Sequence, residues 1–341
     1  MLREVHASGQ LTNGGPMVVA LENRLRKFLG ADYFLSMANG TLALQIAIQA
    51  LQLKGEVITT PYTYVATANS ILWEHCTPIF VDIDPTNYGI DPRLVTEKIT
   101  PNTTAILGTH VYGIPNDIEG LSEIAEKHGL KLLFDAAHCF GVTYKGKSLT
   151  SYGDASTLSF HATKVFHTVE GGGLVLHSEE DQQRAYNLRY FGHQYDDYFG
   201  TGNNAKMSEV HAVYGHCVLD SFDALIAQRK VIFNRYIEAF SDLSWISLLS
   251  LPKDLDWNYG YFPLFLESEG ATLKLKSHLE ANDVFPRRYF YPSINTLNHM
   301  PTPSECPVSE SLSTRVLCLP VYPGLDKSDQ DRIIDLMVGF H

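Results

Sequence analysis

The feature of this 341-residue sequence that most limits its fold is a repeated alternation of short apolar runs and segments with helical periodicity. Short apolar runs bounded by turn-forming residues are typical of strands that are buried on both faces. The predicted strands are residues 32–37, 56–60, 78–83, 104–109, 132–135, 158–160 and 173–177. Because strands that alternate with helices usually lie parallel in one sheet, we predict a doubly wound α/β fold with a parallel sheet.

The helical segments suggest a division into two domains. Residues 17–29 and 118–128 have helical periodicity, and residues 208–240 form one long helical pattern. Beyond it, we predict strands at residues 259–266 and 315–322 and helices at residues 270–281 and 326–338. Since a long helix often links a large domain to a C-terminal one, we predict a large α/β domain at residues 1–220 and a small α+β domain at residues 221–341.

Composition excludes several classes of protein. The hydrophobic fraction of 45% and the charged fraction of 19% are those of an ordinary globular protein. A formal net charge of -12 argues against nucleic acid or an anionic membrane as a partner, so an anionic substrate needs a local group of cations. No apolar run is long enough for a signal peptide or a membrane span. The five cysteines include no CxxC pair and predict free thiols in a cytoplasmic, reducing environment.

Two polar residues follow predicted strands in a way that suggests cofactor chemistry. Asp135 ends the apolar run at residues 132–134, and Lys164 follows the run at residues 158–160. In open α/β sheets, ligands bind at the carboxyl ends of the strands. A carboxylate there keeps a pyridinium nitrogen protonated, and a desolvated lysine is a neutral amine that forms an imine with an aldehyde. Taken separately, Asp135 reads as a helix cap and Lys164 as a surface lysine; taken together, they predict pyridoxal 5'-phosphate (PLP).

A further predicted ligand position lies at the start of a helix. Asn39, Gly40 and Thr41 follow the strand at residues 32–37 and open a helical segment. A glycine there allows a ligand to approach closely, and the free N–H groups of a helix N-terminus attract an anion. Thr41 can cap the helix and also donate its hydroxyl. The alternative is a plain capped helix with no ligand.

Longer motifs resemble a known family. The segments DAAHCFG at residues 135–141 and SFHATKVFHTVEGGG at residues 159–173 are similar to those of the DegT/DnrJ-type sugar aminotransferases. Further segments occur in the family's order, so the resemblance covers nearly the whole chain. They are LTNGGP, NGTLAL, VITTPYTYVATAN, THVYGIPND, GNNAKMSEVHA and LCLPVYP. It implies a PLP-dependent transferase of the aspartate-aminotransferase fold (fold type I), acting on a nucleotide-linked keto sugar. FHATKVF and RRYFYPSIN look most like the members that make dTDP-4-amino-4,6-dideoxyglucose.

The resemblance implies four contacts to the cofactor's ring. Lys164 would bind PLP as a Schiff base, and Asp135 would pair with the pyridinium nitrogen. His138 would lie near the phenolic oxygen, and Tyr64 would stack on the ring.

The resemblance also implies the phosphate contacts. The phosphate of PLP would be held by Gly40, Thr41 and Ser159 of the same subunit. Asn204 would reach the phosphate of the PLP bound to the other subunit, in a homodimer with shared active sites. Many members have arginine where this chain has Lys206, which keeps the charge but loses the bidentate fork. A proline-containing segment that usually precedes LTNGGP is mostly missing, which leaves open whether Met1 is the native start.

One group of cations suggests where a sugar nucleotide binds. Arg287 and Arg288 are the only adjacent arginines in the chain, and three aromatic residues at 289–291 follow them. We predict that both arginines bind the nucleotide diphosphate, with the alternative of a solvated pair at the start of a strand.

The resemblance implies dTDP-4-keto-6-deoxyglucose as acceptor and L-glutamate as amino donor. Alternatives are a 3-aminotransferase or a dehydratase that acts on another nucleotide sugar, linked to dTDP, UDP or GDP. Related dehydratases carry histidine in place of the Schiff-base lysine, so Lys164 disfavours that reading. A PLP-binding regulatory protein is the alternative from another class, but the acidic charge and the length leave no room for a DNA-binding segment. The motif His167-x-x-Glu170 suggests a metal, which the neighbouring glycines disfavour.

Overall fold

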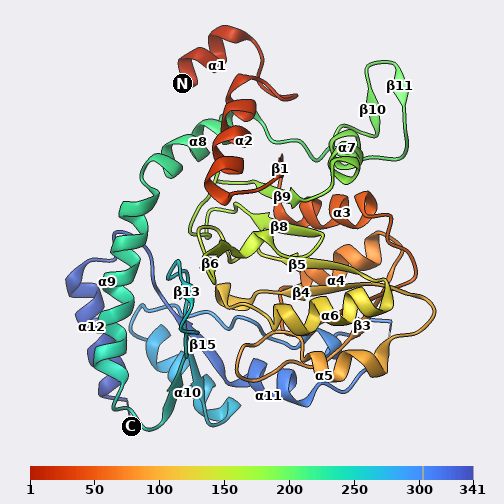
Figure 1. Cartoon of the computed structure of the whole chain (residues 1–341). Helices are drawn as coiled ribbons and strands as arrows, with labels where there is room; N and C mark the ends of the chain where they lie inside the picture. The colour runs from red at the N-terminus through yellow and green to blue at the C-terminus, as the bar shows by residue number, and fades with distance from the viewer. Residues whose placement is uncertain (302, 341) are drawn as a thin grey trace.

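The body of the protein is a seven-stranded sheet with helices on both faces (Figure 1). The computed structural model describes residues 1–301 and 303–340. The strands of the sheet lie in the order β1-β9-β8-β5-β4-β2-β3. The strands are β1 (Tyr33–Met37), β2 (Glu56–Thr59), β3 (Thr77–Phe80), β4 (Thr103–Thr109), β5 (Lys131–Asp135), β8 (Ala155–Ser159) and β9 (Gly172–Leu176). The predicted α/β alternation is confirmed, with boundaries that differ by up to a few residues.

Successive residues of each strand enter two separate cores, one on each face of the sheet. In β5, Leu132 and Phe134 pack in one core and Leu133 packs in the other. In β2, Ile58 and Val57 divide in the same way. Since side chains alternate across a strand, apolar residues at every position require a cover on both faces. The helices supply that cover.

Eight helices belong to the N-terminal two thirds of the chain. They are α1 (Leu2–Ser8), α2 (Pro16–Leu29), α3 (Gly40–Ala50), α4 (Val65–Trp73), α5 (Pro92–Val95), α6 (Ile118–His128), α7 (Glu179–Leu188) and α8 (Glu209–Asp220). Short 3-10 turns are η1 (Thr96–Lys98), η2 (Val111–Gly113) and η3 (Leu149–Ser151). Helix α3 packs on β8 and β9, and α6 packs on β4 and β5.

The sheet differs from the prediction in one strand. β2, β3, β4, β5 and β8 are parallel, but β9 lies antiparallel between β8 and β1. A parallel pairing of β8 and β9 would need a crossover, usually a helix, whereas residues 160–171 form only a loop between them. The chain therefore turns back beside β8. This returning loop carries Lys164.

The prediction that residues 208–240 are helical is confirmed, but the prediction of one continuous helix is wrong. The structure has two helices, α8 and α9 (Phe222–Phe240), which meet at Ser221. Ser221 has φ -106° and ψ 3°, outside the helical region, and serine is a weak helix former that favours helix ends. The predicted domain boundary at residues 220/221 falls at this break, and it remains a prediction.

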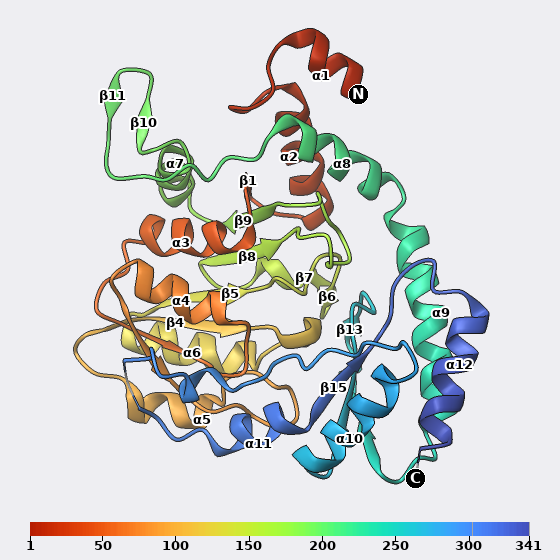
Figure 2. The same cartoon turned by 180° about the vertical axis from the view of Figure 1, so that it is seen from behind.

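The C-terminal part contains a second, antiparallel sheet in the order β12-β14-β15. The elements of this C-terminal part include β12 (Ile246–Leu248), β14 (Phe262–Leu266), α10 (Glu269–Glu280), η4 (Ile294–Thr296), α11 (Pro307–Arg315), β15 (Val316–Leu319) and α12 (Lys327–Val338). Helices α9 and α12 lie side by side along the outer edge of this part (Figures 1 and 2).

Short strands complete the fold. β6 (Thr143–Tyr144), β7 (Lys147–Ser148) and β13 (Leu255–Asp256) form a small sheet, and β10 (His193–Gln194) pairs with β11 (Asp197–Tyr198) in a projecting hairpin.

The segment that follows residue 290 is tied to the large sheet. Asp82 follows β3, and its carboxylate accepts the backbone N–H groups of Val308 at 2.8 Å and Ser309 at 2.9 Å, at the start of α11. The backbone N–H of Ile294 donates to the carbonyl of Pro61, after β2, at 3.0 Å. These bonds hold residues 290–301 and 303–309, which we name the tied segment, against the carboxyl ends of the large sheet.

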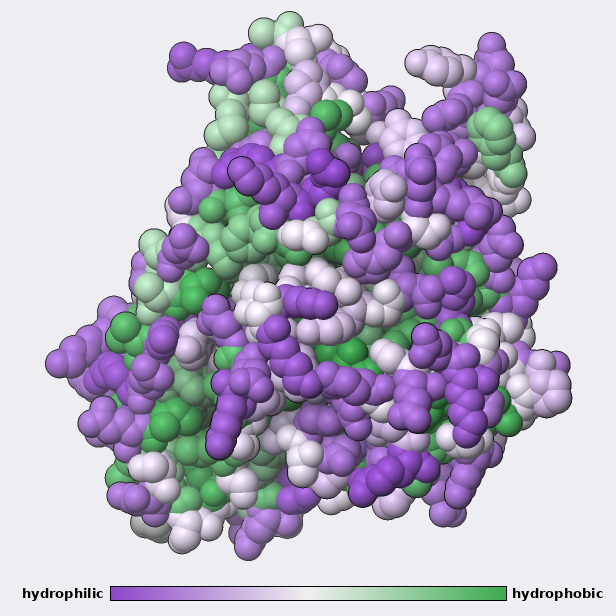
Figure 3. All heavy atoms as spheres, in the orientation of Figure 1, coloured by the Kyte–Doolittle hydropathy of each residue, from purple (hydrophilic) through white to green (hydrophobic). Residues whose placement is uncertain are grey.

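The face of the molecule seen in Figure 1 is covered mainly by hydrophilic side chains, with smaller apolar areas among them (Figure 3). Across the residues that the structure describes, none of the helices combines the length and the apolar character that crossing a membrane requires.

Candidate active site

A cavity of about 490 Å³ lies at the carboxyl ends of β2, β4, β5 and β8. Its volume is in the range of small-molecule sites, and its position is the one where open α/β sheets bind ligands. The predicted site residues that line it are Gly40, Thr41, Tyr64, Asp135, His138, Ser159, Lys164 and Arg287. Asn204 and Arg288 are not among its lining residues. The structure therefore gathers residues from distant parts of the chain around one cavity.

The N-terminus of α3 forms one end of the cavity. Asn39, and not Thr41, caps this helix, because its side chain accepts the N–H of Leu42 at 2.8 Å. The Thr41 hydroxyl is thus left exposed at the cavity. A Cβ atom at Gly40 would lie only 3.0 Å from the Cβ atom of Ser159, so glycine allows this close approach without displacing Ser159. Free N–H groups and two hydroxyls at a helix start suit an anion such as a phosphate.

Asp135 is buried at the end of β5, where two donors hold its carboxylate. The Thr67 hydroxyl donates to one oxygen at 2.7 Å, and the backbone N–H of Ala137 donates to the other at 3.1 Å. Burial raises the pKa of the Asp135 carboxyl, while Thr67, Ala137 and the charge of Lys164 lower it. Since these donors favour the charged form, they oppose the cost of burying a carboxylate.

Two further threonines extend this network, and the sequence analysis missed them. The Thr67 hydroxyl gives its single proton to Asp135, so it accepts from Thr63 at 2.8 Å, and Thr63 accepts from Thr109 at 3.1 Å. All three hydroxyls therefore donate toward the carboxylate, and such chains strengthen one another. The spacing of four residues between Thr63 and Thr67, just after a strand, is the sequence signal that points to this pair.

His138 follows Asp135 by three residues and is also buried. Its Nδ1 atom accepts the backbone N–H of Tyr112 at 3.0 Å, which leaves Nε2 to carry the proton of the neutral ring. Burial, and then the charge of Lys164, holds the pKa of His138 well below its ordinary value. The ring stacks on Phe290 with centroids 5.6 Å apart. His138 is thus a neutral, rigidly held donor at the cavity.

Lys164 lies in the loop between β8 and β9, and its side chain is half-buried. Its amine donates to the Tyr261 hydroxyl at 3.2 Å. Burial lowers the pKa of Lys164, which Asp135 partly opposes. A lowered pKa increases the fraction of neutral, nucleophilic amine. Tyr261 belongs to the predicted strand at residues 259–266, but nothing in its local sequence indicated a contact with Lys164.

Tyr64 and Arg287 border the mouth of the cavity. Tyr64 is 61% exposed, which leaves its ring available to a ligand. Arg287 is exposed as well, and its backbone pairs with Cys318 of β15. Among the described residues, the Arg287 guanidinium has neither an ion pair nor a hydrogen bond. An unpaired guanidinium at a cavity is available to an anion.

Arg288 has a different environment from its neighbour. Its guanidinium forms an ion pair with Glu269 at 2.8 Å, donates to the carbonyl of Thr314 at 3.1 Å and lies 3.4 Å from the ring centroid of Tyr291. Its partners are therefore already within the C-terminal part. Glu269 and Thr314 engage the Nη2 atom of Arg288, and the residue does not line the cavity, so its predicted contact with the substrate stays a prediction.

Asn204 lies apart from the cavity of its own chain. Its backbone forms an isolated bridge with Tyr190, and its exposed side chain accepts a hydrogen bond from Lys206. It lies a few residues after the hairpin formed by β10 and β11, which projects from the body (Figure 1).

The known proteins named below are similar to this chain over nearly all of its length. The sequence model of the DegT/DnrJ/EryC1/StrS aminotransferase family matches residues 1–338. The dTDP-4-amino-4,6-dideoxy-D-glucose transaminase of Shigella dysenteriae is 41% identical over 331 residues, which are 95% of this chain and 90% of that protein. The crystal structure of DesI in the presence of its TDP-sugar product has a TM-score of 0.94 at 34% identity, covering 98% of this chain and 87% of that one. The structure of ntda from Bacillus subtilis with bound cofactor PMP has a TM-score of 0.91 at 28% identity, covering 99% and 80%.

Proposed function

Because the chain belongs to the DegT/DnrJ/EryC1/StrS aminotransferase family, and is therefore a PLP-dependent sugar aminotransferase, we propose that it transfers an amino group from L-glutamate to C4 of dTDP-4-keto-6-deoxyglucose. The fold described above is that of the aspartate-aminotransferase group, fold type I. The choice of this sugar nucleotide rests on the similarity to the transaminase of Shigella dysenteriae. The TDP-sugar named for the DesI structure supports the same substrate class.

The observation that carries the proposal is the joining of three chemically different groups in one cavity. These are the open N-terminus of α3 with Gly40, the buried carboxylate of Asp135, and the half-buried amine of Lys164. They fit the phosphate, the ring nitrogen and the aldehyde of PLP in turn. We propose that Thr41 and Ser159 add hydroxyl contacts to the phosphate.

When bound, PLP supplies an electron sink and carries the amino group from one substrate to the other. Asp135 keeps the pyridine nitrogen protonated, and the donors from Thr67 and Ala137 keep Asp135 ionised for that task. Neutral His138 would donate its Nε2–H to the phenolic oxygen, and Tyr64 would cover the ring.

Lys164 both holds the cofactor and moves the proton. Its Nζ atom would hold the cofactor's aldehyde carbon, and it would be a free amine while the amino donor occupies that carbon. The freed amine takes the proton from the carbon that carries the donor's amino group, and its lowered pKa suits it to act as a base. In the second half of the cycle the same atom returns a proton to C4 of the sugar.

Product analysis tests the proposed substrate. Purified enzyme with PLP and L-glutamate is incubated with 4-keto and 3-keto sugars linked to dTDP, UDP or GDP, and the products are identified by mass spectrometry and NMR. We expect the 4-amino product of dTDP-4-keto-6-deoxyglucose to form fastest. Amination at C3, or a preference for UDP or GDP, would replace the proposed substrate while leaving the aminotransferase chemistry intact.

Arg287 gives a prediction that separates the two substrates. We propose that its unpaired guanidinium binds the diphosphate of the sugar nucleotide. Arg287→Ala is expected to raise the KM for the sugar nucleotide by about tenfold or more, because a charge-assisted hydrogen bond contributes about 1.5–3 kcal/mol, and to change the KM for glutamate much less. Arg288→Ala is the matched control, since it removes the same charge beside Glu269. Equal changes in both KM values for Arg287→Ala would contradict the assignment.

We also propose a homodimer whose subunits share their active sites. Asn204 is exposed and does not line the cavity of its own chain, and the preceding hairpin presents Tyr195 at 94% and Tyr198 at 77% exposure. Exposed aromatic residues on a projecting hairpin are typical of a contact surface. A twofold pairing would carry Asn204 to the phosphate in the second copy.

Mixed subunits test the sharing of sites. In a heterodimer of a Lys164→Ala subunit and an Asn204→Ala subunit, one shared site contains both defects and the other contains none. We therefore expect purified heterodimers to recover about half of the wild-type activity, by the symmetry of a twofold dimer. A heterodimer of Lys164→Ala and Asp135→Asn subunits is the control and should recover nothing, because both residues belong to the same half-site. Failure of the first pair to recover, or a monomer in solution, contradicts the proposal.

Five free cysteines, four of them buried, support a reducing compartment for this enzyme, and we propose the cytoplasm.

A further inference from the structure

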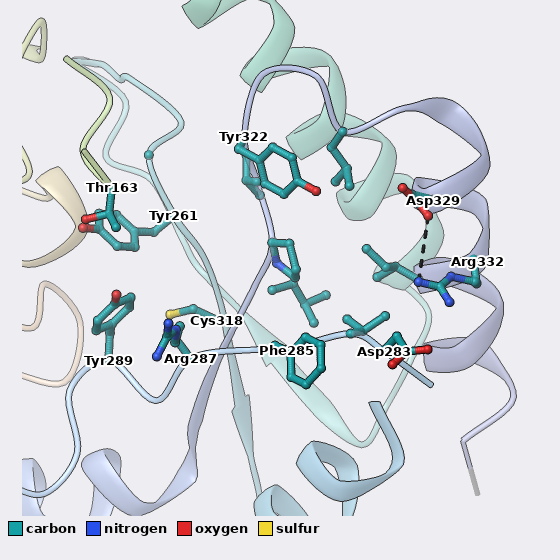
Figure 4. A pocket seen from close by; sticks show the side chains of 17 residues that line it. Thr163, Tyr261, Asp283, Phe285, Arg287, Tyr289, Cys318, Tyr322, Asp329 and Arg332 are labelled. Atoms are coloured by element: carbon teal, nitrogen blue, oxygen red, sulfur yellow. Dashed lines mark ion pairs between the residues drawn. The ribbon is translucent and has the colours of Figure 1, made fainter. Parts of the chain in front are cut away.

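Two cavities meet at the loop that carries Lys164. Besides the cavity described above, one of about 420 Å³ lies between β15, α12 and residues 283–289 in the C-terminal part (Figure 4). Thr163, Arg287 and Tyr289 line both cavities. Tyr261 lines the second cavity, yet its hydroxyl accepts the hydrogen bond from the Lys164 amine at 3.2 Å. Tyr261 therefore lies between the two cavities, and its hydroxyl contacts Lys164, which lines the first of them.

The Tyr261 ring is held on several sides. Its centroid lies 4.3 Å from that of His138, 5.7 Å from that of Tyr289 in an edge-to-face arrangement, and 5.8 Å from that of Tyr112. The side chain is half-buried, and contacts with three rings restrict the orientations that the Tyr261 ring can take. The hydroxyl is therefore a fixed point, whereas the lysine side chain has four rotatable carbons.

The backbone before Tyr261 is anchored to the loop that follows β5. The Asn258 side chain donates to the carbonyls of His138 at 2.9 Å and Phe140 at 3.0 Å, and accepts the N–H of Gly260 at 3.1 Å. The Tyr261 hydroxyl thus keeps a constant position relative to His138, and hence relative to Asp135.

Lys164 needs such a fixed partner once its amine is free. The amine must take a proton from one carbon and return it to another. If the side chain is flexible, the amine is in a reactive orientation for only a small fraction of the time. The Tyr261 hydroxyl accepts one N–H of the amine, and burial keeps the pKa of the phenol above its ordinary value, so the phenol stays neutral. Among the described residues, this is the hydrogen bond that the Lys164 side chain makes.

We propose that Tyr261 is a positioning residue for this reaction, whose hydroxyl holds the Lys164 amine beside the reacting carbon whenever that amine is not bonded to the cofactor. The proposal rests on the role of Lys164 in the proposed function and does not depend on which keto sugar is used. It predicts an effect on the steps in which Lys164 acts, and little effect on binding.

Tyr261→Phe is the central variant, because it removes the hydroxyl and keeps the ring that packs on His138. We expect kcat to fall by about ten- to a hundredfold while both KM values stay within about twofold of the wild type, since loss of a positioning contact acts on the barrier. Tyr259→Phe is the matched control. It removes a hydroxyl two residues away whose ring packs on Phe233 and Trp257, and it should leave kcat unchanged.

A second measurement uses the apo-enzyme and no sugar substrate. PLP is mixed with the apo-protein, and formation of the bond to Lys164 is followed by the change in absorbance in a stopped-flow instrument. In Tyr261→Phe we expect bond formation to slow by about tenfold, while the dissociation constant for the initial, non-covalent complex stays the same. Replacement of Tyr261 by 3,5-difluorotyrosine weakens the hydroxyl as an acceptor and keeps the ring. It should slow bond formation by a smaller factor, and it tests the proposal if Tyr261→Phe does not fold.

The possible outcomes separate the two proposals. If PLP never bonds to Lys164 in the wild type, the proposed function fails. If the bond forms in the wild type and Tyr261→Phe forms it at the same rate with an unchanged kcat, the proposed function stands and the role of Tyr261 is refuted. A loss of kcat accompanied by equal weakening of PLP binding would also refute it, because that pattern indicates a packing role.

Discussion

Lys164→Ala is expected to abolish transamination, with a loss of more than about a thousandfold. Proton transfer by a positioned side chain contributes about 10²–10⁴-fold by itself, and the variant loses the covalent attachment of PLP as well. The fold should persist, because backbone bonds from Phe160 to Gly171 and from Thr168 to Phe160 anchor the loop without the lysine side chain. Turnover, the absorbance of protein-bound PLP and circular dichroism measure the three effects.

Chemical labelling identifies the lysine directly. Borohydride reduction of the wild-type enzyme with PLP should fix the cofactor to a peptide that contains Lys164, and the same treatment of Lys164→Ala should label nothing specifically. Lys206→Ala, which removes a half-buried lysine outside the lining of the cavity, is the control and should still be labelled at Lys164. Specific labelling at any other lysine refutes the assignment.

Asp135→Asn is expected to retain PLP but to lose about a thousandfold or more in kcat. An amide cannot keep the pyridine nitrogen protonated, and each tenfold loss of rate corresponds to about 1.4 kcal/mol of barrier. The side chain keeps its shape, so an amide oxygen can still accept from the Thr67 hydroxyl. Steady-state kinetics with saturating PLP, and equilibrium dialysis of PLP, measure the two expectations separately.

The control for Asp135→Asn is a second buried aspartate with a purely structural position. Asp91 is 6% exposed, caps α5 and is bonded to Arg93, remote from the cavity lining. Asp91→Asn should alter the thermal unfolding temperature more than kcat. If Asp135→Asn behaves in the same way, Asp135 is only a structural carboxylate at the end of β5.

The strand ends were predictable because their signal is local. Asp135 directly follows an apolar run, and Gly40 directly precedes a helical pattern, so the fold class alone brings both to one edge of the sheet. Lys164 was predictable for the same reason, although the antiparallel return of β9 was not. A strand's direction depends on which neighbour it pairs with, and neither an apolar run nor a triple glycine specifies that neighbour.

The side chains that modify these groups were harder to predict. Thr109 and Tyr261 reach the site from distant segments, and neither has a local sequence pattern that reveals its hydrogen bond. The pair Arg287 and Arg288 illustrates the same limit, since adjacent residues in an extended segment face opposite ways. Local sequence cannot say which of the two meets Glu269.

The attachment of the tied segment to the large sheet has a consequence for how substrates are exchanged. Opening the site by a hinge in the tied segment would remove the N–H groups of Val308 and Ser309 from the buried carboxylate of Asp82 and leave it the N–H of Ile83, at a cost of several kcal/mol in every turnover. The substrates and products of this aminotransferase must therefore enter and leave through a mouth of nearly constant width. Product release should then depend on diffusion and on the motions of single side chains, and the enzyme should turn over in a crystal or on a solid support almost as readily as in solution.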